Sequence, residues 1–310
     1  GASPWQAPAT LMLIAQVEMQ GVWSVRGGMK ALAQSVADLA AERGVSFRWN
    51  SSCQQILTKA ERVNGVRLTT GEQLDAEVVV FNGDVNALAS GLLGEDLRQA
   101  AMATPKPRRS LSAMTWCSLA NTQGWPLVRH NVFFDHHYKS EFDDIFTRRR
   151  LPRTPTVYVC AQDRPGMADS HSAERLFCLV NAPAHGDEPE RIEEIEQCET
   201  TSFEQLSRLG LSLQGHSKVR ASPAQFHRRF PGSVGSLYGK ATHGWMSIFA
   251  RPGAHTALPG LFLAGGGTHP GPGVPMTALS GMQAAAAVTA NLASIKKYHP
   301  VATFGGMSTP

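Results

Sequence analysis

The residues best suited to chemistry form a glycine-rich turn near the C-terminal end of the sequence, LFLAGGGTHPGPGVPMTALSG (261–281). The apolar residues 261–264 predict a short strand, and Pro275 suits the first turn of a helix that follows. Because residues 265–267 lack side chains, their backbone N–H groups could closely approach a phosphate or an aromatic ring. A strand, a glycine turn and a helix N-terminus in this order are typical of a site for a polyanion or a dinucleotide.

The turn departs from the usual dinucleotide-binding fingerprint, so its residues leave two interpretations open. Counted from Gly265, Pro270 stands where the third glycine of G-x-G-x-x-G would be, and that motif occurs nowhere in the sequence. A stretch as rich in Gly and Pro as 265–273 can also be a tight connection with a purely structural role. From its residues alone, the turn is either a cofactor contact or such a connection.

Histidines and cysteines are the other candidates for chemistry. His269 lies in the turn and is a weak candidate for a catalytic acid or base, the alternative being an imidazole that caps the turn. His130, His136 and His137 have a spacing more typical of a polar surface than of a metal site. The cysteines include no CxxC pair, so we predict no bound metal, reduced thiols and a cytosolic compartment.

The composition narrows the class of protein. With 310 residues, 42% of them hydrophobic and 17% charged, the chain is typical of a globular protein. Its net charge of +4 is too small to indicate a nucleic-acid partner. A membrane span needs about 18 strongly apolar residues. Polar side chains interrupt the alanine-rich run 278–295, so this run is expected to be a packed helix.

The hydrophobic pattern predicts an α/β protein in which short strands alternate with helices. Helix 29–43 is expected to bury the face that carries Met29, Val36 and Leu39, and stretch 105–153 is expected to be irregular. The predicted strands are 45–49, 53–59, 63–69, 73–81, 156–160, 175–181 and 261–264. The other predicted helices are 84–102, 189–209 and 275–295, with mixed structure over 210–258.

Several motifs, in this order and spacing, resemble the phytoene desaturase family of FAD-dependent carotenoid desaturases. They are Gly27-Gly28-Met29 with its helix, residues 62–66, residues 76–80 with Asn82-Gly83-Asp84, and residues 260–275. The AGxGTHPGxGxP pattern in the last of these is specific to that family. The resemblance covers nearly the whole chain and is greatest to the branch that acts on hydroxylated or methoxylated neurosporene-type carotenoids.

The resemblance implies a two-domain α/β (α+β) fold like that of FAD-dependent amine oxidases, with a Rossmann-like FAD domain and a mixed-sheet substrate domain. The family's first βαβ unit, with GxGxxG, would precede Gly1, so we expect the chain to be a fragment. The expected segments are 1–26 for a helical part of the substrate domain, 27–90 for the FAD domain, 91–245 for the substrate domain, 246–298 for a return to the FAD domain, and 299–310 for a polar tail.

The resemblance also implies where FAD would bind. Gly265 to Thr268 would line the pyrophosphate and ribityl side, and Val274 to Thr277 would bring a helix N-terminus to the pyrimidine edge of the flavin. Cys53 stands where the family usually has a valine whose backbone contacts adenine. The candidate cofactor-binding residues are therefore Cys53, Gly265, Gly266, Gly267, Thr268, Val274, Pro275, Met276 and Thr277.

The implied reaction makes a new C=C bond in a polyene, 3,4-desaturation of a 1-hydroxy or 1-methoxy carotenoid being preferred. Phytoene desaturation, carotenoid isomerisation and a non-catalytic carotenoid- or membrane-binding fragment are the alternatives. A carotenoid substrate implies peripheral contact with the inner face of a bacterial membrane, where the basic residues 148–153 could dock. Glu18 and Arg26 could line the substrate cleft or form a surface ion pair, and quinone or oxygen could reoxidise the flavin.

An apolar tunnel for the carotenoid would need aromatic side chains, although core packing is the default role of such residues. The candidates for its lining are Trp116, Trp125, Phe133, Phe134 and Phe142.

Overall fold

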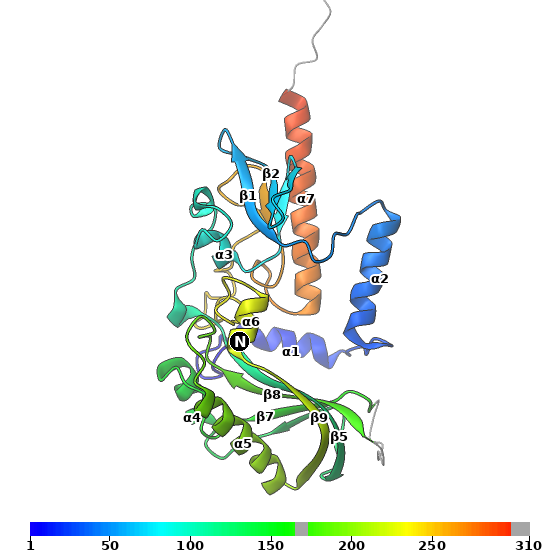
Figure 1. Cartoon of the computed structure of the whole chain (residues 1–310), viewed down its shortest axis with the longest axis vertical. Helices are drawn as coiled ribbons and strands as arrows, with labels where there is room; N and C mark the ends of the chain where they lie inside the picture. Colours follow the sequence, from blue (N-terminus) through cyan, green and yellow to red (C-terminus); the bar gives the residue numbers. More distant parts are fainter. Residues whose placement is uncertain (165–172, 299–310) are drawn as a thin grey trace, which may run out of the picture.

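A five-stranded antiparallel sheet forms one end of the molecule in the computed structural model, which describes residues 1–164 and 173–298 (Figure 1). The sheet expected to be mixed is antiparallel at every pairing, because β8 turns back along β7 and both neighbours of β5 run against it. In spatial order its strands are β6 (His130–Phe133), β7 (Val157–Ala161), β8 (Glu174–Ala182), β5 (Ser112–Gly124) and β9 (Leu211–Ala221).

The long central strand β5 corrects the prediction that residues 105–153 are irregular. Its first five residues, 112–116, are all buried, so both faces of the strand are covered and the usual alternation of polar and apolar residues is absent. The same stretch also contains β6, the short helix α4 (Tyr138–Phe142) and a π-helical turn at Asp143–Thr147. The predicted strands 156–160 and 175–181 are confirmed as β7 and β8.

Helix α5 (Ile192–Arg208) packs on this sheet, as the pattern over 189–209 predicts. Ile195 and Leu206 are buried in the sheet's core, and Phe203 contacts the ring of Trp116 edge-on with centroids 5.6 Å apart. Burial of an aliphatic side chain of this size contributes roughly 1.5–3 kcal/mol to folding. The helix ends are less buried than predicted, because Ile192 is 51% exposed and Leu209 is 37% exposed.

Two small sheets and a long helix form the other end of the molecule (Figure 1). Ile56 and Val63 pack against Leu261 and Leu263, so one apolar core joins both sheets. The first sheet is an antiparallel meander of β1 (Cys53–Lys59), β2 (Arg62–Leu68) and β3 (Gln73–Asp75). The second pairs β4 (Val79–Phe81) with β10 (Leu261–Leu263) in parallel, and α7 (Val274–Tyr298) follows β10 and packs against it.

Two strand predictions in this part of the chain need correction. Residues 73–81 are not one strand, because 73–75 pair with β2 whereas 79–81 pair with β10 in the other sheet. Residues 45–49 form no strand, since no described segment pairs with them. The side chains of Phe47 and Trp49 stack on each other instead, with ring centroids 5.3 Å apart.

The predicted helix 84–102 is also wrong in extent. Only α3 (Val85–Ala89) and a 3₁₀ turn at Glu95–Leu97 form, because Gly91 and Gly94 between them adopt positive φ values of 78° and 135°. A further short helix, α6 (Pro223–Arg229), begins with a capping box at Ser222 inside the stretch expected to be mixed.

Helix α2 (Gly28–Glu42) lies at the side of the molecule, and helix α1 (Met12–Met19) runs toward it across the middle (Figure 1). The expected helix at 29–43 is present, but its apolar face is exposed, since no described element packs against Met29, Val36 or Leu39. Within the described residues, no helix is long and apolar enough to span a membrane. The expected polar tail, 299–310, lies outside the described residues.

Candidate cofactor-binding site

The glycine turn begins where the parallel pair β4–β10 ends. Gly265 has a φ of 116°, and a Cβ atom on it would lie 2.6 Å from Nδ2 of Asn82. That amide is fixed, because it donates a hydrogen bond of 3.0 Å to the carbonyl oxygen of Ala264. A side chain at residue 265 would therefore collide with the strand end that supports the turn.

Ser280 on α7 holds the first half of the turn. Its hydroxyl accepts a hydrogen bond of 3.0 Å from the Gly265 N–H and lies 2.5 Å from the hydroxyl of Thr268. The Thr268 hydroxyl also donates to the Gly265 carbonyl at 2.7 Å. The Thr268 side chain is buried and committed to these bonds, and its backbone N–H donates to the Gly265 carbonyl at 3.1 Å, so Thr268 has no donor left for an anionic ligand.

The middle of the turn offers free hydrogen-bond donors. In the described part of the chain, the N–H groups of Gly266 and Gly267 donate to no other group, and both residues are partly exposed. Backbone donors of this kind are what an anionic oxygen accepts from. Val274, at the start of α7, is exposed beside them, so the helix N-terminus with its positive dipole end is also accessible.

Arg251 supports the glycine turn through hydrogen bonds to backbone carbonyl groups. Its guanidinium donates to the carbonyl oxygens of Gly266 at 3.2 Å, Tyr238 at 2.9 Å and Lys240 at 2.9 Å. No carboxylate pairs with it among the described residues, and burial lowers the pKa of this guanidinium. Arg251 therefore ties the segment 238–240 to the glycine turn through the backbone alone.

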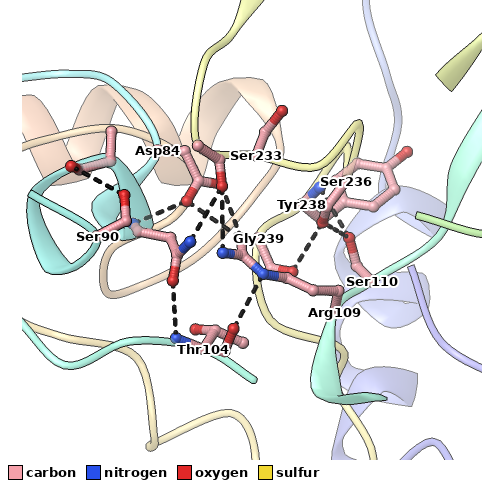
Figure 2. Close-up of polar contacts among 12 residues, drawn as sticks. Asp84, Ser90, Thr104, Arg109, Ser110, Ser233, Ser236, Tyr238 and Gly239 are labelled. Atoms are coloured by element: carbon pink, nitrogen blue, oxygen red, sulfur yellow. Dashed lines mark hydrogen bonds and ion pairs between the residues drawn. The ribbon is translucent and has the colours of Figure 1, made fainter. Parts of the chain in front are cut away.

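A buried ion pair joins the two ends of the molecule next to this turn (Figure 2). Nη1 of Arg109 lies 3.1 Å from the carboxylate of Asp84, which also accepts from the N–H of Asn86 at 2.8 Å and caps α3. Nε of Arg109 donates to the Thr104 carbonyl, and Nη2 donates to the Gly232 carbonyl, each at 3.2 Å. Each of the three nitrogens of this guanidinium therefore donates to a group within the protein.

The other predicted cofactor-binding residues lie in two separate places, the start of α7 and the start of β1. Val274, Pro275, Met276 and Thr277 form the first turn of α7, and the Thr277 hydroxyl donates back to the Gly273 carbonyl at 3.0 Å. Cys53 lies at the start of β1 with its thiol exposed, and no described contact joins it to the glycine turn. All five cysteines are free in the structure.

The histidine candidates are not brought together. The His269 N–H donates to the Pro252 carbonyl at 2.8 Å, but its imidazole makes no hydrogen bond within the described residues. His130 bonds the Tyr158 hydroxyl at 2.7 Å, far along the sequence from the turn. No cluster of three or more potential metal ligands occurs among residues 1–164 and 173–298.

The aromatic residues proposed for a tunnel divide into two groups. Trp116, Phe133 and Phe142 are buried in the cores, as the default interpretation predicts, and the Trp116 indole donates to Glu199 at 2.8 Å. Trp125 and Phe134 are exposed over half of their surface. Trp116, Phe133 and Phe142 could line a tunnel only if the cores that bury them repacked.

The basic cluster at 148–153 is partly neutralised. Arg148 and Arg150 both pair with Asp144, at 2.8 and 2.7 Å, and Arg149 pairs with Glu188 at 3.0 Å. Burial opposes ionisation of Asp144, but the hydrogen bonds from the two arginines outweigh it and lower the pKa of this carboxyl. Glu18 and Arg26, the other charged candidates, are exposed and form no ion pair with each other.

Sequence reasoning missed Arg251 and Ser280, the two side chains that fix the glycine turn. Each bonds backbone atoms 11 to 15 positions away in the sequence, and neither belongs to a short motif with a known mechanism. The only available signal was the residue types themselves, a serine on an alanine-rich helix and an arginine in a loop.

The fold and the turn together define a class: an α/β protein in which a glycine turn with unpaired backbone donors lies between the last described parallel strand and the helix that follows it. The chain belongs to the family of flavin containing amine oxidoreductases, which it matches over residues 9–289. The cofactor class of that family agrees with the FAD expected from the sequence.

Two relatives carry a more specific name. Over 315 aligned residues, the chain is 56% identical to the hydroxyneurosporene desaturase of Rubrivivax gelatinosus, covering 100% of this chain and 60% of that protein. It is 42% identical to the hydroxyneurosporene desaturase of Rhodobacter capsulatus, covering 96% of this chain and 60% of that protein. The chain thus spans about three-fifths of the length of these relatives.

Among solved structures, an oxidoreductase from Methanosarcina mazei shares the fold. It is 19% identical with a TM-score of 0.51, and the match covers 83% of this chain and 54% of that protein. This likeness supports the two-part α/β architecture described above.

Proposed function

We propose that the protein is an FAD-dependent carotenoid desaturase, which makes a C=C bond by 3,4-desaturation of a 1-hydroxy or 1-methoxy carotenoid of the neurosporene type. The observation that carries this proposal is the glycine turn with its free Gly266 and Gly267 donors, at a position where the flavoprotein family pattern matches. The substrate class follows the names of the two relatives at 56% and 42% identity.

The residues present fit a flavin dinucleotide. The unpaired N–H groups of Gly266 and Gly267 would hold the diphosphate, and residues 274–277 would hold the edge of the ring system. The positive end of the α7 dipole would stabilise negative charge at that edge. When bound, the flavin supplies the hydride acceptor that the protein itself lacks.

The chain's own contribution to the reaction is binding, orientation and exclusion of water. Arg251 and Ser280 hold the turn through the Gly266 carbonyl and the Gly265 N–H, so among the described residues the N–H groups of Gly266 and Gly267 stay without a partner. In the overall reaction, two hydrogens leave adjacent carbons, one as a hydride and one as a proton that passes to solvent or to a base. His269, with its unbonded imidazole, is the candidate base on this chain.

The division into domains is part of the same proposal. Residues 27–90 and 246–298 would form the FAD domain, and residues 91–245 would form the substrate domain, with 1–26 beside it. The two separate apolar cores support this division, one around Leu261 and Leu263 and the other around Trp116. A C40 polyene dissolves in the bilayer, so we also propose peripheral contact with the inner face of a bacterial membrane.

The test is expression of the gene in a host that accumulates 1-hydroxyneurosporene, followed by analysis of the extracted carotenoids. The expected product has lost two hydrogens and absorbs at longer wavelength, because its conjugated system is longer. Unchanged 1-hydroxyneurosporene together with depletion of phytoene would replace the proposal with phytoene desaturation.

A further inference from the structure

An open cleft next to the glycine turn carries positive charge that the protein does not neutralise. The cleft encloses about 730 Å³ and is lined by Asp84, Arg109, Gly239 and Gly267 among others, several of which are drawn in Figure 2. A second hollow of about 430 Å³ adjoins it and shares Arg108 and Lys240 with it. Asp84 is the one acidic residue in the described lining of either hollow.

Two cations in the lining of these hollows, Arg108 and Lys240, have no charged partner among the described residues. Asp84 is bound to Arg109, and Arg251 is bound to three carbonyl oxygens. Arg108 and Lys240 make no side-chain hydrogen bond or ion pair within the described residues. Residue 109 pairs with Lys240 across an isolated antiparallel bridge, so these two unpaired cations lie on neighbouring backbone segments.

Large apolar side chains stand exposed beside these cations. In the adjoining hollow, Trp245 is 78% exposed and Met246 is 48% exposed, and Phe249 at the rim of the larger cleft is 66% exposed. Their turn is ordered, since the Ser247 N–H donates to the Gly244 carbonyl at 3.1 Å and the Phe249 N–H donates to the Met246 carbonyl at 3.1 Å. A structured turn therefore holds three apolar side chains in water.

We propose that this surface, the Trp245 surface (Arg108, Lys240, Trp245, Met246 and Phe249), docks the protein on anionic phospholipid. Arg108 and Lys240 bind the headgroup phosphate, and the three apolar side chains enter the interface between headgroups and acyl chains. Tryptophan favours that depth of a bilayer, and each nearby Lys or Arg strengthens attraction to anionic lipid. The proposal rests on the proposed function, because a carotenoid enzyme must take its substrate from a membrane.

Two other surfaces are less suited to this role. The arginines at 148–150 share the carboxylates of Asp144 and Glu188, whose two negative charges offset part of their positive charge. The apolar faces of α1 and α2 are broad, but nothing in the structure shows what covers them. The Trp245 surface differs from both, because its unpaired Arg108 and Lys240 and its exposed apolar side chains line two adjoining hollows.

The experiment measures sedimentation of the protein with vesicles and the wavelength of its tryptophan emission. Vesicles of phosphatidylcholine containing about 30% phosphatidylglycerol should bind the protein and shift its emission to the blue, and pure phosphatidylcholine should not. The Arg108→Gln/Lys240→Gln variant should bind about 25-fold more weakly, since each of the two cations contributes a factor of about five. Trp245→Ser should weaken binding and remove most of the blue shift.

The matched control removes the same charge elsewhere. Arg43→Gln/Lys59→Gln replaces two exposed cations that have no described side-chain partner, and it should change vesicle binding less than two-fold. Equal weakening by both double variants would mean diffuse charge attraction and would overturn the proposal. So would binding of inorganic phosphate to the wild-type chain, lost in Arg108→Gln/Lys240→Gln, without any binding to vesicles.

The readout is independent of the proposed reaction, because vesicle binding needs neither flavin nor carotenoid. If the protein desaturates the carotenoid in cells but does not bind vesicles, the docking proposal is wrong and the proposed function is unaffected. Vesicle binding with no desaturation would instead count against the proposed function. Circular dichroism of each variant, expected to match the wild type, keeps a folding defect from being mistaken for a binding defect.

Discussion

At the scale of single residues, the site depends on backbone groups that particular side chains leave free or hold in place. Gly265 is required by its φ of 116° and by the Asn82 amide beside it, whereas the glycines that follow expose free N–H groups. The sequence predicted the turn and its glycines. It could not predict that the Thr268 hydroxyl is used up internally, because that depends on Ser280 in a different element.

Gly265→Ala should damage the turn. The new methyl group would meet Nδ2 of Asn82, and the positive φ strains any residue with a Cβ, so we expect a loss of about 1–3 kcal/mol in unfolding free energy. Flavin uptake should fall by at least ten-fold, measured by titration of flavin fluorescence. Gly281→Ala on α7, where a Cβ would meet nothing within 4 Å, is the control and should be neutral or slightly stabilising.

Asp144 should make stability depend on pH. Its pKa is lowered in the folded state, so its stabilisation is present above the unfolded pKa of about 3.9 and is lost as pH falls through the folded value. Asp144→Asn should cost about 2 kcal/mol at pH 7, in line with charged hydrogen bonds, and less as pH falls below about 4. Urea denaturation across pH measures this difference.

The neighbour Asp143 provides the control for that measurement. It lies in the same π-helical turn, and its side chain makes no hydrogen bond or ion pair within the described residues. Asp143→Asn should therefore change stability little at any pH. A cost for Asp144→Asn that stays constant between pH 7 and pH 3 would contradict the assignment of its arginine partners.

At the scale of elements, regular amphipathic segments were predictable and centrally buried or short ones were not. Helix α5 and the β7–β8 pair follow their sequence patterns within a few residues. Strand β5 was missed because both of its faces are buried, so its Ser, Thr and Ala residues show no period of two. Residues 45–49 have a strand-like composition but no described partner, which only the three-dimensional arrangement reveals.

Arg251 joins the segment 238–240 to the glycine turn through three hydrogen bonds to backbone carbonyl groups. Arg251→Met keeps most of the volume but leaves three carbonyl oxygens without their donors, so we expect a loss of about 3 kcal/mol in unfolding free energy. Flavin affinity should fall as well, because Gly266 loses its anchor. Arg43→Met, which removes an arginine with no described side-chain partner, should leave both quantities unchanged.

At the scale of the whole molecule, two cores are joined by a buried polar junction. The core around Leu261 and the core around Trp116 are separate, and the Asp84–Arg109 pair lies between their elements (Figure 2). The sequence indicated the motif 82–84 but not its partner, because 25 residues separate Asp84 from Arg109. The fold class could therefore be predicted from sequence motifs. The contact that fixes the two ends of the molecule to each other could not.

Asp84→Asn should loosen this junction. Removing one partner leaves the Arg109 charge buried without compensation, so we expect a loss of about 3 kcal/mol and a broader unfolding transition. Asp96→Asn, on the exposed 3₁₀ turn, is the control and should cost much less. Equal, small effects of the two substitutions on urea denaturation would show that the junction does not couple the two ends.

The central claim is that a flavin held at the Gly265–Gly267 turn accepts hydrogen from a carotenoid. Its most direct test mixes the flavin-loaded protein with 1-hydroxyneurosporene in the absence of oxygen and follows the flavin absorbance near about 450 nm. The account predicts loss of that absorbance in step with formation of one additional C=C bond per flavin. Retention of a fully oxidised, bound flavin beside unchanged carotenoid would contradict it.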